Sequence, residues 1–209
     1  MADMKHVVLA GDSIFDNGVY TGGGPDVVTQ VRGLLPAGWK ATLLAVDGAT
    51  TLNIPYQMER FPAEATHIVM SVGGNNALTE ATRLGLSLFG QTMNSQPVSW
   101  EALADVMDGF ERGYREAVEA CLEKKVPTTV CTIYNGCFPD PEAQRTARVA
   151  LTIFNDVILR VAREKSLAVI ELRSICRMPG DYANPIEPSS AGGEKIARAI
   201  VEQVTRGGR

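Results

Sequence analysis

The chain has 209 residues, 45% of them hydrophobic, and a formal net charge of −4. This composition is typical of a globular protein with one core, and it argues against a disordered or membrane-spanning chain. Because the charge is slightly negative and no dense cluster of lysine and arginine occurs, we expect neither nucleic acid nor an anionic membrane as a partner. We expect one domain over residues 1–209.

The start of the chain and its cysteines both favour a cytoplasmic protein. Six residues precede the first apolar run, too few for a signal peptide with its basic, apolar and cleavage regions. Four cysteines (Cys121, Cys131, Cys137 and Cys176) have no paired CxxC spacing and are expected to be reduced thiols. We predict no membrane insertion, no cofactor and no metal, and the sequence does not fix the oligomeric state.

Five short apolar runs predict five strands. They cover residues 7–10, 41–46, 67–72, 128–134 and 167–172. The first is a continuous apolar run led by Val7 and Val8, without the alternation of a half-exposed strand. Such a run is typical of a strand buried on both faces of a parallel sheet.

Helical patterns separate the strands. Apolar residues recur at steps of three or four in residues 27–35, 100–125 and 142–165, which predicts three amphipathic helices. Residues 52–61 and 77–89 are expected to form shorter or weaker helices, residues 91–99 a polar link, and residues 173–188 no regular structure. A last helix is expected to begin near Ser189 and Ser190, whose hydroxyls suit an N-cap. The alternation predicts an α/β fold: a three-layer α/β/α sandwich around a five-stranded parallel sheet of flavodoxin-like order.

Three of the expected strands end in polar loops that contain glycine. Gly11, Asp12 and Ser13 follow the first strand, Asp47 and Gly48 the second, and Gly73, Gly74, Asn75 and Asn76 the third. In open α/β sheets, ligands bind outside the carboxyl ends of the strands, so we expect these loops to form one site. Each block alone is also an ordinary turn signal, because glycine, aspartate, asparagine and serine all favour turns.

Taken together and in this order, the three blocks resemble the SGNH (GDSL) hydrolase family of esterases and lipases. The resemblance implies a flavodoxin-like hydrolase fold, hydrolysis of a small-molecule carboxylic ester, and Ser13 as the nucleophile. It also implies an oxyanion hole formed by the Ser13 N–H, the Gly48 N–H and the Asn75 side-chain amide. Fixed donors of this kind stabilise the oxygen charge that develops during acyl transfer.

Other polar residues near the expected strand ends are candidate substrate contacts. They are Asp12, Asn76, Tyr134 and Asn184. The family usually has an aspartate where this chain has Asn76, a change that removes a carboxylate and affects loop geometry more than chemistry. Asn135 could also line the pocket, and residues 17–24 and 173–188 are the expected lids.

The family's late Asp-x-x-His block is absent. In its place the chain has Glu187 at the histidine position and Asn184 at the aspartate position. The two histidines, His6 and His67, lie at the starts of strands whose far ends carry the motifs. A strand advances about 3.3 Å per residue, so each lies on the order of 20 Å from Ser13 and is expected to have a packing role.

Three hypotheses remain for Glu187. It could accept the Ser13 proton directly, although a carboxylate with the reference pKa of about 4.3 is a weak base, so burial or a like charge must raise it. Asp12, Asp16 and Asp181 are carboxylates that could lie nearby. Alternatively, the site turns substrate over slowly, or it is an inactive ligand-binding or sensing domain. The simplest structural alternative is a carboxylate stabilised by the dipole of the last helix.

A cysteine nucleophile is a further alternative. Cys131 and Cys137 lie within and just after the fourth expected strand. Neither has a histidine nearby to form the thiolate, and free cysteines are often buried.

Overall fold

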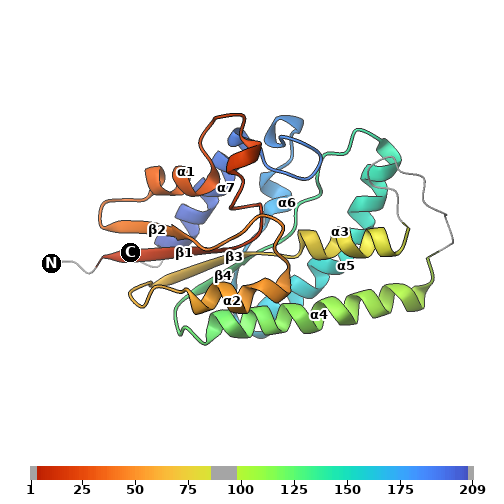
Figure 1. Ribbon diagram of the computed structural model, residues 1–209, viewed down its shortest axis with the longest axis horizontal. Helices are drawn as coiled ribbons and strands as arrows, with labels where there is room; N and C mark the ends of the chain where they lie inside the picture. The colour runs from red at the N-terminus through yellow and green to blue at the C-terminus, as the bar shows by residue number, and fades with distance from the viewer. Residues whose placement is uncertain (1–3, 86–97, 207–209) are drawn as a thin grey trace.

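The computed structural model describes residues 4–85 and 98–206, and within them it confirms the predicted α/β architecture (Figure 1). Five strands form one parallel sheet in the order β2-β1-β3-β4-β5, which is the flavodoxin-like order. The strands are β1 (Lys5–Gly11), β2 (Trp39–Leu43), β3 (His67–Ser71), β4 (Thr128–Cys131) and β5 (Ala168–Ile170).

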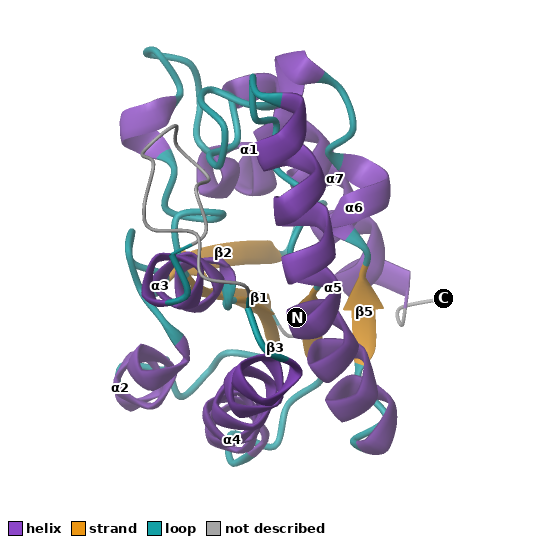
Figure 2. Cartoon of the chain, turned by 90° about the vertical axis from the view of Figure 1, so that its right-hand side faces the viewer, coloured by secondary structure: helices purple, strands orange, loops and turns teal. Residues whose placement is uncertain are grey.

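Helices cover both faces of this sheet (Figure 2). One face carries α1 (Val27–Leu34) and α7 (Ser190–Thr205), which pack against each other. The other face carries α2 (Ile54–Glu59), α4 (Trp100–Leu122) and α5 (Pro141–Glu164). The remaining helices are α3 (Gly74–Arg83) and α6 (Leu172–Ile175), with single 3-10 turns at Gly18–Tyr20, Thr51–Asn53 and Pro179–Asp181.

The central strand explains why the sheet needs two helix layers. Val7 and Leu9 belong to the core under α1 and α7, whereas Val8 and Ala10 belong to the core under α2, α4 and α5. All four side chains are fully buried. The continuous apolar run therefore fills both faces, as predicted for a covered parallel sheet.

The register brings the carboxyl ends of the strands to one edge. Gly11 at the end of β1 pairs with Ser71 at the end of β3, and Leu9 pairs with Leu43 at the end of β2. The chain turns away after each of these strands. The segments that carry the predicted site residues therefore leave the sheet from the same side.

Several predicted boundaries differ from the structure. β4 and β5 end at Cys131 and Ile170 rather than at residues 134 and 172. The second strand is Trp39–Leu43 rather than residues 41–46, because the backbone N–H groups of Leu44 and Ala45 both donate to Leu9 as the chain bends out of the sheet. Helix α3 begins at Gly74, so Asn75 and Asn76 lie in its first turn and not in a loop. The segment 173–188, expected to be irregular, contains most of α6 and a 3-10 turn, both too short to produce a periodic pattern.

The other predicted helices agree with the structure within a few residues, and Ser189 is the N-cap of α7, its side chain accepting a hydrogen bond from the Gly192 N–H. The expected polar link over 91–99 and the end of the helix expected over 77–89 lie largely outside the described residues. Within residues 4–85 and 98–206, no helix is both long and apolar enough to cross a bilayer.

Candidate active site

The structure brings Ser13 and Glu187 together, although 174 residues separate them in the chain. The Ser13 hydroxyl donates a hydrogen bond to Glu187 Oε1 over 3.1 Å. Both residues are 6% exposed, so water has little access to the contact. The structure therefore places Glu187 next to Ser13, as expected, and its role as a base stays a prediction.

The backbone before Ser13 is held tightly. Gly11 has φ +136°, and a side-chain carbon at this position would lie 1.8 Å from the Ser71 carbonyl oxygen, so only glycine fits. The buried amide of Gln57 contacts both polar groups of Gly11, accepting from its N–H and donating to its carbonyl, each over 2.8 Å. Gln57 was not predicted, because a glutamine in a short helix gives no indication that it faces the sheet.

Asn184 acts on the backbone next to Glu187. Its Oδ1 accepts hydrogen bonds from the N–H groups of Ile186 and Glu187, over 3.0 and 2.9 Å. Asn184 is itself exposed and is not among the residues that line the pocket beside Ser13. Asn184 thus fixes the loop that carries Glu187.

Two further side chains fix the same loop from other elements. The Tyr134 hydroxyl donates to the Ile186 carbonyl over 2.6 Å, and the Asn17 side-chain amide donates to the Pro188 carbonyl over 3.1 Å. Tyr134 and Asn17 are both buried. Because the residues on either side of Glu187 are held in this way, the carboxylate is oriented before any ligand binds.

The environment of Glu187 favours the protonated form. Its Oε2 is buried and has no hydrogen-bond partner among the described residues. Burial raises the pKa of Glu187 to about 7, the hydrogen bond from Ser13 opposes this, and the charge of Asp47 adds to it. Burial thus outweighs the groups that favour the carboxylate form of Glu187.

Asp12 is a second buried carboxyl group in the same pocket, and it is 3% exposed. Burial raises the pKa of Asp12 to about 7, against a hydrogen bond from the Ile14 N–H, and the Glu187 charge raises it further. No cation pairs with Asp12 or Glu187 within the part of the chain that the structure describes. The charge of Glu187 therefore disfavours ionisation of Asp12.

The other carboxylates considered near Glu187 have their own partners. Asp16 accepts a hydrogen bond from the Asp47 N–H over 2.9 Å, which ties the loop after β1 to the loop after β2. Asp181 binds Lys195 over 2.5 Å. Of the three predicted neighbours, Asp12 is the one that shares the pocket of Glu187.

The predicted oxyanion donors occupy different surroundings. Asn75 lines the pocket with Ser13, and its Nδ2 donates to the Ala49 carbonyl over 2.9 Å, which uses one of its two amide hydrogens. Gly48 precedes Ala49 and is exposed, with φ +79°, in a separate groove that Asp47, Tyr56 and Arg60 also line. Within the described chain, neither the Ser13 nor the Gly48 N–H donates a hydrogen bond, so both remain available.

Asn76 has a connecting role. It accepts a hydrogen bond from the Thr51 N–H and donates one to the Thr51 hydroxyl, both over 3.1 Å. These bonds fasten the first turn of α3 to the segment after β2. The three predicted loops therefore converge, and Asn76 uses its side chain to hold them rather than facing the pocket.

An apolar pocket opens beside Ser13 and Glu187. It encloses about 720 Å³, including the part open to solvent. Most of its lining is apolar and comes from α3, α5 and the loops after β1, β4 and α6: Ile14, Val72, Ala77, Leu78, Ala81, Ile133, Phe138, Ala147, Ala150, Leu151 and Ile186. Tyr134 and Asn135 also line it, as predicted, whereas none of residues 17–24 does, so only the later of the two expected lids contributes.

The alternative nucleophiles and bases are not suited to this site. Cys131 is buried within β4, where burial and the charge of Asp12 raise the pKa of its thiol and oppose thiolate formation. Cys137 is half-buried and does not line the pocket. His6 and His67 lie at the opposite edge of the sheet, with ring nitrogens hydrogen-bonded to threonines over 2.8 and 2.9 Å.

The strand order and the serine after β1 define an α/β protein with the SGNH hydrolase fold. The model of the GDSL-like lipase/acylhydrolase family matches residues 9–195, so the chain belongs to this family of enzymes that hydrolyse esters. No curated protein sequence matches the chain.

Solved structures share the fold at low sequence identity. An extracellular lipase from Streptomyces rimosus is 13% identical with a TM-score of 0.69, over 96% of this chain and 99% of that one. A lipolytic protein of the G-D-S-L family from Veillonella parvula is 16% identical with a TM-score of 0.70, over 97% and 99%. An acetyl xylan esterase is 16% identical with a TM-score of 0.66, over 95% and 99%.

Proposed function

We propose that this protein hydrolyses carboxylic esters through an acyl-enzyme on Ser13, with Glu187 as the general base. The observation that carries the proposal is the contact between the Ser13 hydroxyl and a buried carboxylate at the mouth of an apolar pocket. Membership in the lipase/acylhydrolase family supports the reaction class.

The raised pKa lets Glu187 replace an imidazole. Histidine has a reference pKa of about 6.5, and burial brings the pKa of Glu187 to about 7. Its carboxylate therefore accepts a proton at least as readily as histidine does, and its protonated form is acidic enough to return it. A base whose pKa is close to the working pH is the most effective for such transfers.

The reaction proceeds in two balanced steps. Ser13 Oγ attacks the ester carbonyl carbon while its proton passes to Glu187 Oε1, and the tetrahedral intermediate collapses as that proton moves to the departing alkoxide. Water then attacks the acyl-serine, gives its proton to Glu187, and the acid is released as Ser13 regains the proton. The Ser13 N–H, the Gly48 N–H and the second Asn75 amide hydrogen are the proposed donors to the oxyanion.

The pocket favours an apolar acyl group. Its walls are mainly alanine, leucine, isoleucine and phenylalanine side chains, which bind hydrocarbon without leaving polar groups unpaired. Two structural neighbours are a lipase and an acetyl xylan esterase, which supports an ester substrate in general. Of the proposed substrate contacts, Asp12 and Tyr134 line the pocket, while Asn76 and Asn184 support it from outside.

Covalent labelling with a fluorophosphonate tests the nucleophile without a guess about the substrate. The label should be found on the Ser13 peptide by mass spectrometry, should be lost in Ser13→Ala, and should persist in Ser174→Ala, where the exposed serine of α6 is replaced. Labelling elsewhere, or none in the wild type, contradicts the proposal.

Hydrolysis of a short activated ester then tests the base. If Glu187 works as proposed, Ser13→Ala should abolish turnover above background and Glu187→Gln should lower it about 10³-fold. If the wild type is inactive and only Glu187→His gains activity, the site has lost its base and functions as a binding domain.

A further inference from the structure

A second groove lies beside the ester pocket, on the outer side of α5. It encloses about 730 Å³, including the part open to solvent, and is lined by Asn135, Arg145, Arg148, Val149, Thr152 and Arg173. Asn135 lines the ester pocket as well, so the two spaces lie on either side of this residue. We call this second space the arginine groove.

Helix α5 forms one wall of each space. Ala147, Ala150 and Leu151 face the ester pocket, whereas Arg145 and Arg148, three residues apart on one helix face, line the arginine groove. A ligand that reaches around this helix at Asn135 therefore passes from an apolar to a cationic surface.

Two of the three arginine charges in this groove have no carboxylate partner among the described residues. Arg145 and Arg148 are exposed and form no ion pair within the described chain, unlike Arg160 on the same helix, which binds two carboxylates. Arg173 is half-buried and is held by Glu171 through contacts of 2.5 and 2.7 Å. Two guanidinium groups of a protein with a net charge of −4 thus point into one groove without a partner.

We infer that the arginine groove binds an anionic group, a carboxylate or a phosphate, carried by the alcohol part of the ester. The inference rests on the proposed function. The apolar walls of the ester pocket suit the acyl chain and exclude a charge, which leaves the alcohol part to the side at Asn135. Guanidinium groups bind carboxylate and phosphate oxygens in pairs, and they suit these anions better than any neutral alcohol.

A pair of octanoyl esters measures this preference. One has para-hydroxybenzoate as its alcohol part and the other para-hydroxybenzamide, so they differ by one negative charge. The ratio of their kcat/KM values is compared between the wild type and variants, because the intrinsic reactivity of each ester then cancels. We expect the anionic-to-neutral ratio to fall about three- to tenfold in Arg148→Gln and in Arg145→Gln, and less at high salt.

Arg163→Gln is the matched control. Arg163 is exposed on the same helix and forms no ion pair within the described chain, and it lies 15 residues from Arg148, roughly 22 Å along the helix at 1.5 Å per residue. Its replacement removes the same net charge but should leave the ratio unchanged. An equal fall in all three variants indicates only long-range electrostatics and overturns the inference.

Two more esters test which anion the groove prefers and which part of the ester carries the charge. The octanoyl ester of para-hydroxyphenyl phosphate distinguishes a phosphate from a carboxylate preference, and an acyl chain that ends in a carboxylate tests whether the charge belongs on the acyl side instead.

Calorimetric binding of the same esters to Ser13→Ala does not depend on turnover. Preferential binding of the anionic ester without hydrolysis in the wild type contradicts the proposed function but supports the groove, whereas equal binding of both esters overturns the groove.

Discussion

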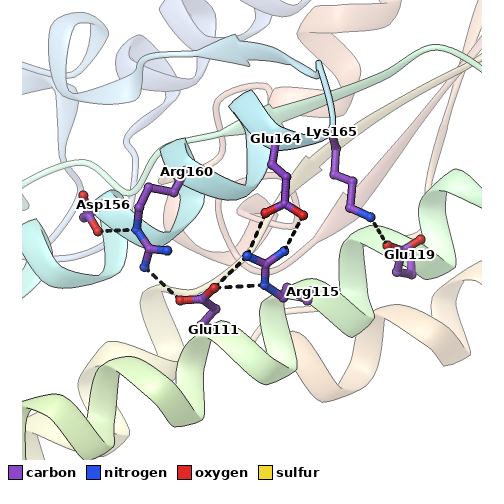
Figure 3. A network of polar contacts seen from close by, with 7 residues as sticks. All are labelled: Glu111, Arg115, Glu119, Asp156, Arg160, Glu164 and Lys165. Carbon is purple, nitrogen blue, oxygen red and sulfur yellow. Dashed lines mark hydrogen bonds and ion pairs between the residues drawn. The ribbon is translucent and has the colours of Figure 1, made fainter.

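The protein places its carboxylates in two opposite environments. In the active site, Asp12 and Glu187 are buried without a cation, and burial raises the pKa of each to about 7. Along the contact between α4 and α5, carboxylates alternate with arginine and lysine in an exposed network (Figure 3). There, hydrogen bonds from Arg160 and Arg115 hold the pKa of Glu111 below its usual value.

The network between α4 and α5 shows how a carboxyl group, that of Glu111, is kept ionised. Glu111 contacts Arg115 over 2.7 Å and Arg160 over 2.8 Å, and Arg115 also contacts Glu164 over 2.8 Å. These contacts join the two long helices on the surface, where water also solvates the charges. The difference from Glu187 is therefore one of surroundings: a charged partner and solvent preserve the carboxylate, and their absence produces a base near neutral pH.

The largest expected effect is on turnover. Glu187→Gln keeps the shape of the side chain but cannot accept the Ser13 proton, so kcat for a short ester should fall about 10³-fold. Glu111→Gln, the same substitution in the exposed network, should leave kcat unchanged. A Glu187→Gln enzyme with wild-type kcat would show that Glu187 is not the general base.

The pH profile gives the next effect. A base must be deprotonated, so kcat/KM should rise with pH through about 7, and below that value it should fall about tenfold per pH unit. Asp47→Asn removes a negative charge that opposes ionisation of Glu187, so it should move the rise to lower pH. Glu111→Gln should not move it. A rise that stays in place or moves to higher pH in Asp47→Asn contradicts this effect of the Asp47 charge.

Stability should respond in the opposite direction to activity. A carboxyl group whose pKa is raised in the folded state costs stability above that pKa, and the cost disappears as pH falls toward the unfolded value of about 4.3. Glu187→Gln should therefore increase the free energy of unfolding at pH 8 by about 2 kcal/mol, with a smaller gain at pH 5. Urea denaturation at both values measures this. An equal gain at the two values would mean that ionisation of Glu187 is not the cause.

The sequence was sufficient for the fold because strong local signals agreed with each other. The apolar run of β1, the helical spacing of α4 and α5, and the Ser189 N-cap all indicate the observed elements. Boundaries were wrong where tertiary contacts decide them. β2 ends early because Leu9 on β1 accepts the hydrogen bonds of the departing chain, which no pattern within residues 41–46 reveals.

The sequence predicted which residues belong to the site better than it predicted their contacts. The motif blocks placed Ser13 and Glu187 in one site, and the structure gives their contact. The roles of Gln57 and Asn17 were not predictable, since both bind backbone groups of segments far away in the chain. The raised pKa of Glu187 also could not be read from the sequence, because it depends on which side chains exclude water from the carboxylate.

The smallest expected effect lies in the exposed network. Glu111→Gln removes the carboxylate shared by Arg115 and Arg160, but Arg115 retains Glu164 and Arg160 retains Asp156. Exposed pairs contribute little, so the free energy of unfolding at pH 7 should fall by only ~0.5 kcal/mol.

The loss should be removed by high salt, because screening acts on exposed charges, whereas the gain in Glu187→Gln should persist there, since burial and not a distant charge is its main cause. The two variants carry the same chemical change, and urea denaturation at low and high salt compares them directly. If high salt removes the change in unfolding free energy in both variants, or in neither, then screening does not distinguish the exposed carboxylate from the buried one.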